Sequence, residues 1–226
     1  MRKFLFGLTL ALAITGAQAG TAVQTGTDVT FTYDDSTLFG LGTVVGNSLF
    51  FSPTTFKAQS TNTQGAVLTN ATLNITVTVN AGSSLVLTEF QLVELGDYQL
   101  SGTSSSVDAS GRLQVTSNTT ICGVLFPCLD SQVFTAGPLT TTGALTNWSA
   151  SAGIDFANTA GWGTDTNVIA QIQNDLSATS TVSGESAMVQ KKAQGVGLIV
   201  NPVPVPAAAW LFGSALGLLG WMRRRK

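Results

Sequence analysis

The sequence predicts an all-β protein with a single domain, an antiparallel β-sandwich or jelly roll. The middle of the chain is rich in Thr, Ser, Gly, Asn and Val, which favour strands and turns over helices. Apolar and polar residues alternate along most of it, and such runs recur about every 10 residues between turn residues. The same alternation argues against the alternative of a disordered Thr/Ser-rich stalk.

The first half of the chain contains the clearest strand patterns. Strands are expected, in order, at 28–33, 44–51, 56–58, 72–79, 85–94, 98–100 and 113–115. The strongest pattern alternates four apolar residues with outward polar ones: Leu73, Ile75, Val77 and Val79. A polar loop is expected at 59–69, and turns at Asn80-Ala81-Gly82 and at Gly96-Asp97.

The second half is less regular. A strand pattern at 142–156 has four apolar residues: Leu145, Trp148, Ile154 and Phe156. Residues 167–179 fit a helix that begins after Asp165 or Thr166, and they also fit a strand whose inward side chains include Val168 and Ala170. We favour the strand, because β patterns surround the segment. The last strands are expected at 187–190 and 196–200.

The N-terminus has the pattern of a secretory signal peptide over residues 1–19. Two cations, Arg2 and Lys3, precede an apolar run, and Ala17-Gln18-Ala19 forms a small-x-small cleavage site before Gly20. We therefore expect the general secretory machinery and signal peptidase as partners. The exported domain would span residues 20–201.

The C-terminus combines three features in residues 202–226. Prolines alternate with valines over 202–206, an uncharged apolar stretch follows over 207–222, and four cations end the chain at 223–226. The apolar stretch predicts a transmembrane helix about 24 Å long, which is short for a bilayer. The cations should stay in the cytoplasm. The part of the chain before the helix would then lie on the other side of the inner membrane.

This order of features resembles the PEP-CTERM sorting signal of bacterial exported proteins. The stretch Val203-Pro-Val-Pro-Ala-Ala-Ala-Trp-Leu-Phe-Gly-Ser214 is similar to its VPxPAAxWLFGS variant, with Val205 where the motif usually has Glu. The resemblance implies recognition by an exosortase and cleavage near Pro204, Val205 and Pro206. In this interpretation the chain is the substrate of the exosortase. The resemblance also implies a Gram-negative host, of a kind that often makes exopolysaccharide. The protein would be anchored briefly, then reach the cell surface or the medium.

Composition excludes several functions. The chain has no histidine, which rules out Ser-His-Asp and Cys-His catalysis and His-ligated metals. Between the two ends lie four cations and all twelve acids, a net charge of −8 that argues against nucleic-acid binding. We expect no cofactor and no metal site. A calcium site somewhere in the exported domain is the alternative, and the acids considered for it include Asp28, Asp34 and Asp35.

Two candidate sites remain in the exported domain. Cys122 and Cys128, the only cysteines, should pair in an oxidising compartment and fix a local hairpin. Four aromatic residues could stack on sugar rings if exposed: Tyr33, Tyr98, Trp148 and Trp162. Trp162, between glycines in an expected loop, is the better candidate, whereas Trp148 should be in the core. We therefore predict a non-enzymatic surface or matrix protein. A carbohydrate-binding module for exopolysaccharide is the alternative, and a secreted carboxylate-dependent hydrolase a third possibility.

Overall fold

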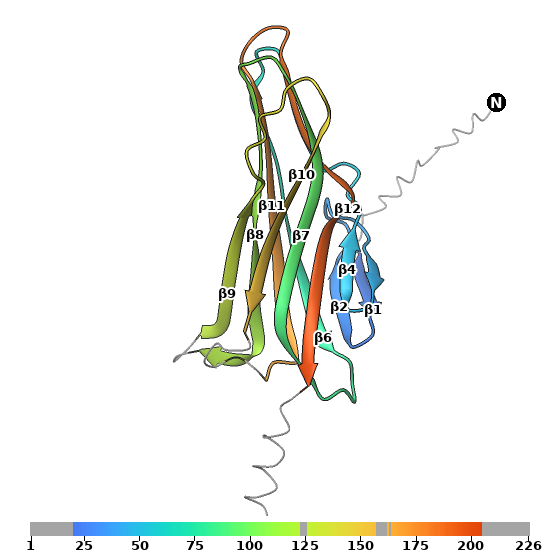
Figure 1. The fold of residues 1–226 in the computed structure, drawn as a ribbon. Helices are drawn as coiled ribbons and strands as arrows, with labels where there is room; N and C mark the ends of the chain where they lie inside the picture. The colour runs from blue at the N-terminus through green and yellow to red at the C-terminus, as the bar shows by residue number, and fades with distance from the viewer. Residues whose placement is uncertain (1–19, 123–125, 157–161, 163, 205–226) are drawn as a thin grey trace, which may run out of the picture.

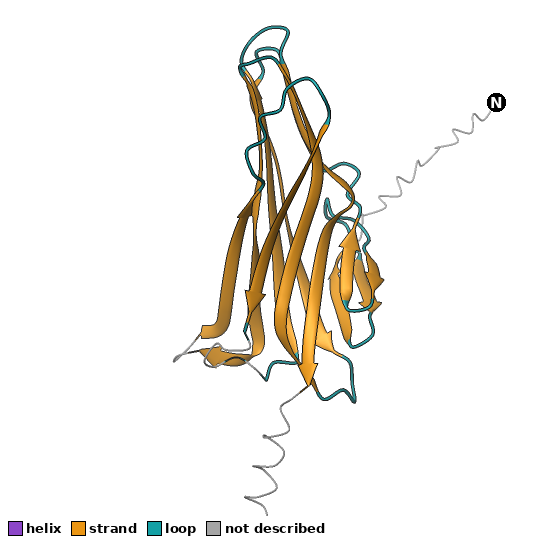
Figure 2. Cartoon of the chain, in the orientation of Figure 1, coloured by secondary structure: helices purple, strands orange, loops and turns teal. Residues whose placement is uncertain are grey.

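The protein is an all-β molecule made of two antiparallel sheets. The computed structural model describes residues 20–122, 126–156, 162 and 164–204, and these contain strands and no helix (Figures 1 and 2). The strands are β1 Thr21–Thr25, β2 Val29–Asp34, β3 Thr43–Val45, β4 Ser48–Phe51, β5 Lys57–Thr61, β6 Gly65–Val79, β7 Leu85–Ser101, β8 Ser105–Cys122, β9 Phe126–Thr135, β10 Thr146–Asp155, β11 Asn167–Ser180 and β12 Ser186–Pro204. The coarse fold prediction is therefore confirmed.

The two sheets pack face to face in a long sandwich-like body (Figure 1). One sheet has the order β1-β2-β6-β11-β8-β9. The other has the order β10-β7-β12-β4-β3, and β5 also pairs with β12. The strand chosen for residues 167–179 is confirmed, because β11 is a central strand paired on both sides, with β6 and β8.

The core lies between the sheets and follows the predicted alternation. Leu73, Ile75 and Val77 are buried on β6, and Trp148 and Ile154 are buried on β10, as expected. Aromatic rings fill much of the remaining space, and six of the largest fully buried side chains are phenylalanines: Phe31, Phe39, Phe51, Phe56, Phe90 and Phe156.

Several expected boundaries are wrong, and turn geometry explains two of them. The strand expected at 44–51 is a hairpin of β3 and β4, because Gly46 adopts a positive φ of 61°. The polar loop expected at 59–69 is only a short turn, since Asn62 (φ 55°) and Gly65 (φ 77°) reverse the chain between β5 and β6. Its polar residues belong to paired strands instead.

The turn expected at Gly96-Asp97 is also wrong. Strand β7 continues through both residues, and the expected strands 85–94 and 98–100 are one element. Gly96 lies opposite Trp148 of β10, whose indole occupies the space that a Cβ would fill. This glycine therefore serves packing rather than a turn.

The expected separate strands at 187–190 and 196–200 are also one strand, β12, with a register shift between Lys191 and Val196. The last residues of β12, Pro202, Val203 and Pro204, still pair with β7. The described part of the chain offers no helix suited to crossing a membrane. The predicted signal peptide and the helix at 207–222 lie outside the described residues.

Candidate functional site: a buried amine, carboxylate and carboxamide

Three polar side chains meet inside the apolar core. Each occupies an inward position next to apolar inward residues of its own strand: Glu94 follows Phe90 and Leu92 on β7, and Lys191 follows Ala187 and Val189 on β12. Asn174 does the same in the opposite sheet, on β11 between Ile172 and Leu176. The alternation of strand side chains thus forces all three into the space between the sheets.

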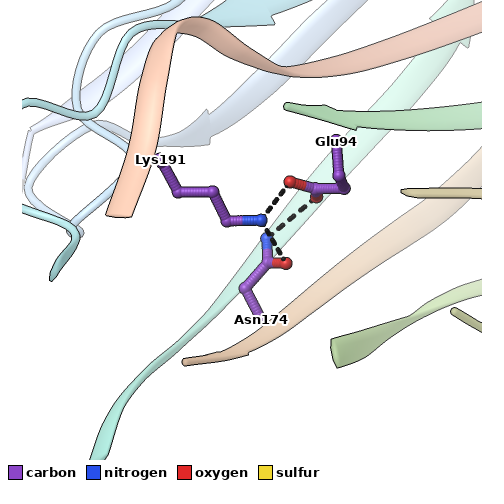
Figure 3. A network of polar contacts seen from close by, with 3 residues as sticks. All are labelled: Glu94, Asn174 and Lys191. Atoms are coloured by element: carbon purple, nitrogen blue, oxygen red, sulfur yellow. Dashed lines mark hydrogen bonds and ion pairs between the residues drawn. The ribbon is translucent and has the colours of Figure 1, made fainter. Parts of the chain in front are cut away.

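The three side chains contact one another directly (Figure 3). Nζ of Lys191 donates to an oxygen of Asn174, Oδ1, over 2.9 Å, and it forms an ion pair with Oε2 of Glu94. Nδ2 of Asn174 donates to Oε1 of Glu94 over 3.0 Å. The carboxylate therefore touches both nitrogen atoms, one with each oxygen. We call these residues the Lys–Glu–Asn cluster.

Aromatic rings surround the amine of this cluster. Nζ of Lys191 lies 4.8 Å from the ring centroid of Trp148, 5.8 Å from that of Phe134 and 6.0 Å from that of Phe56. The side chains of Lys191 and Glu94 have no exposed surface, and Asn174 is fully buried. Water is therefore excluded from the cluster.

Two glycines make room for these rings. In one sheet Gly96 pairs with Trp148 on one side and with Lys191 on the other. In the facing sheet Gly111 pairs with Phe134 on one side and with Asn174 on the other. A Cβ on either glycine would overlap the neighbouring ring. Each ring occupies the space beside its glycine because that glycine has no side chain.

Burial disfavours charge on both ionisable members. Desolvation raises the pKa of Glu94, although the nearby Lys191 and Asn174 act in the opposite direction. Desolvation also lowers the pKa of Lys191, against the attraction of Glu94. Both changes favour a neutral amine beside a protonated carboxyl group.

A second polar cluster fixes the chain before β11. Oδ1 of the buried Asp165 accepts hydrogen bonds from Ser117, from Thr119 (2.6 Å) and from Thr120 (2.8 Å). The backbone oxygen of Asp165 accepts from Leu87 N over 2.8 Å. Asp165 thus joins β8 to β7, whereas the helical alternative had placed it at a helix start. All three hydroxyl groups are donors to one oxygen, which suits a structural role.

The predicted disulfide is present. Cys122 and Cys128 are bonded, with their Cα atoms 4.7 Å apart. Cys122 pairs with Phe126 across β8 and β9, so the bond closes the end of this hairpin as expected. The apolar side chains beside it, Ile121 and Phe126, are exposed.

The aromatic residues considered for sugar binding are mostly covered. Trp162 is partly buried and stacks on Phe156, with ring centroids 3.8 Å apart and planes 3° from parallel. Tyr33 and Tyr98 are buried, and their hydroxyl oxygens accept bonds from Gly42 N (2.8 Å) and Thr141 N (3.1 Å). One ring face at Trp162 is therefore already occupied.

The acidic residues considered for calcium serve the turns around them. Asp34 accepts bonds from the backbone and the hydroxyl group of Ser36, which lower its pKa. Asp28 accepts from Nδ2 of Asn47 over 2.8 Å. Among the described residues, no three or more Asp, Glu, Cys or His side chains are grouped as metal ligands would be.

Of the predicted processing residues, Gly20 precedes β1 and Pro204 ends β12, whereas Ala19, Val205 and Pro206 lie outside the described residues. Sequence reasoning missed the Lys–Glu–Asn cluster. Comparison of the chain with protein-family models, with curated proteins and with solved structures found no match.

Proposed function

We propose that this protein is an exported surface or matrix protein without catalytic activity, sorted and cleaved by an exosortase. The observation that carries the proposal is the C-terminal order of prolines, an apolar stretch and four terminal cations. The secretory pattern at the N-terminus independently directs residues 20–201 across the inner membrane. The protein would be anchored there by its C-terminal helix until cleavage, with the jelly-roll-like domain facing outward.

Features of the folded domain support this proposal. The disulfide between Cys122 and Cys128 suits an oxidising compartment outside the cytoplasm. Strand β12 continues to Pro204, so the first residues of the proposed sorting signal, 202–204, would lie at the end of the sheet (Figure 1). The buried Lys–Glu–Asn cluster is closed to any soluble substrate.

Truncation in the host tests the proposal. The chain should be ended after Pro204 rather than after Asn201, because residues 202–204 pair with β7 and their loss would damage the sheet. We expect the truncated protein to be exported and folded but to escape C-terminal processing and reach the wrong location. Unchanged location and unchanged processing would contradict the sorting proposal. Retention of the disulfide is the control for folding.

A carbohydrate-binding module remains the alternative proposal, with exopolysaccharide as its ligand. It rests on Trp162 alone, because Tyr33 and Tyr98 are buried. Binding of the exported protein to host polysaccharide, lost in Trp162→Ala, would support it. Binding that Trp162→Ala leaves unchanged would remove the residue on which the alternative depends.

A further inference from the structure

The Lys–Glu–Asn cluster contains the parts of a chemical reaction. Lys191 supplies a primary amine, which is a nucleophile when neutral. Asn174 supplies a carboxamide, whose carbon is an electrophile and whose nitrogen can leave as ammonia. Glu94 contacts the nitrogen of each. An ion pair alone would require no carboxamide in contact with both its members, and burial makes such a pair a weak source of stability.

We propose that Lys191 and Asn174 become joined by a covalent amide bond between their side chains. Nζ of Lys191 attacks Cγ of Asn174, the Cγ–Nδ2 bond breaks, and Nδ2 leaves as ammonia. The reaction exchanges one amide for another, so it consumes no oxidant, reductant or cofactor. It occurs once in each molecule, after folding has brought the two strands together.

Glu94 carries the protons. Oε2 first takes a proton from the ammonium group of Lys191, which leaves a neutral amine and a carboxylic acid. As the new bond forms, Nζ loses a second proton and Nδ2 gains one, and Glu94 can relay it because its two oxygens face the two nitrogens. At the end Lys191 keeps one hydrogen on Nζ, ammonia carries three, and Glu94 remains protonated.

The distances suit this attack. Nζ lies 2.9 Å from Oδ1 of Asn174, and the amide C=O bond is about 1.2 Å long, so Cγ lies within about 4 Å of Nζ. Reacting atoms in near-attack geometries are about 3–3.5 Å apart, so a small rotation of either side chain is sufficient. The two strands belong to different packed sheets, which hold the amine and the carboxamide at this separation.

The surroundings favour the reaction over its competitors. The three rings and the absence of exposed surface exclude water, which would otherwise hydrolyse the activated amide. Burial also favours the neutral amine and the protonated carboxyl group, the forms that the attack requires. Ammonia is small and neutral, and its escape makes the step irreversible.

The bond would tie the last strand to the opposite sheet. It would link β12, which leads to the C-terminal tail, with β11 at the centre of the other sheet. This inference does not depend on the sorting proposal, because it uses only groups of the folded domain.

Cleavage at glutamate residues tests the bond. Glu185 lies between Asn174 and Lys191, and the chain has only two other glutamates, Glu89 and Glu94. The full-length chain is reduced, unfolded and cut by a glutamate-specific protease. We expect fragment 95–185 to remain joined to the fragment that begins at Ser186, with a combined mass about 17 Da below their sum through loss of ammonia. Separate fragments from the wild-type chain would overturn the proposal.

Matched variants locate the bond. Lys191→Met and Asn174→Ala should each give separate fragments, whereas Lys192→Met, at the next residue, should leave them joined. Glu94→Gln should also give separate fragments, the first now beginning at Phe90 because one cleavage site is lost. Joined fragments in Lys191→Met would overturn the assignment. The wild-type result decides the proposal even where a variant folds poorly.

Discussion

Adding one methyl group at Gly96 should destabilise the protein markedly. In Gly96→Ala the new Cβ would overlap the indole of Trp148 and the backbone oxygen of Gln190. The backbone oxygen cannot move without shifting β12, and Trp148 is only 5% exposed, so the ring has little room to turn. Overpacking of this kind costs up to about 3 kcal/mol. The gain from replacing a strand glycine by alanine is about 0.5–1 kcal/mol, which leaves a loss of about 2 kcal/mol.

Gly153 provides the matched control for this substitution. It lies in the neighbouring strand β10, and a Cβ there would meet no atom within 4 Å. Urea denaturation followed by tryptophan fluorescence should show a midpoint about 1 M lower for Gly96→Ala, taking a slope of about 2 kcal/mol per M. Gly153→Ala should be as stable as the wild type or more stable by up to about 1 kcal/mol. Equal stability of the two variants would refute the packing role of Gly96.

Two further predictions concern the buried charge and the disulfide. Lys191→Met leaves Glu94 buried without its partner, and because burial raises the pKa of Glu94, the folded state binds a proton more tightly than the unfolded state. Its unfolding free energy should therefore fall as pH rises above the ordinary value of 4.5, whereas the double variant Lys191→Met/Glu94→Gln, which lacks the buried carboxyl group, should lack this trend. Urea midpoints that fall equally in both variants between about pH 4 and about pH 8 would contradict it. The double variant Cys122→Ser/Cys128→Ser should lose only about 2 kcal/mol, since the bond closes a short loop. Thermal unfolding measures this, and complete loss of folding would show that the bond holds more than its hairpin.

The sequence predicts a strand well where one face of the strand is buried and the other face is exposed to solvent. In β6 the apolar residues recur at every second position, and this pattern fixes both the strand and its inward face. The sequence of β11 also fits a helix, and only the β patterns around it favour the strand. The long strand β7 was not predictable in this way. Gly96 looks like a turn glycine in the sequence, as Gly82 does, but Gly82 has a positive φ of 85° and Gly96 lies under an indole ring.

The buried cluster left a signal in the sequence that can be recognised with hindsight. Asn174 continues the inward series of Ala170 and Ile172, and Glu94 and Lys191 likewise continue apolar series on their own strands. A polar residue in such a series must find a partner inside the core. The contact among these three residues could not be predicted, because this contact depends on how the two sheets face each other.

The intact mass of the mature protein, recovered from outside the host cells, tests the sorting proposal most directly. We predict a polypeptide that begins at Gly20 and ends between Pro204 and Pro206, apart from any group attached on release. A polypeptide that still extends from Met1 to Lys226 would contradict the account.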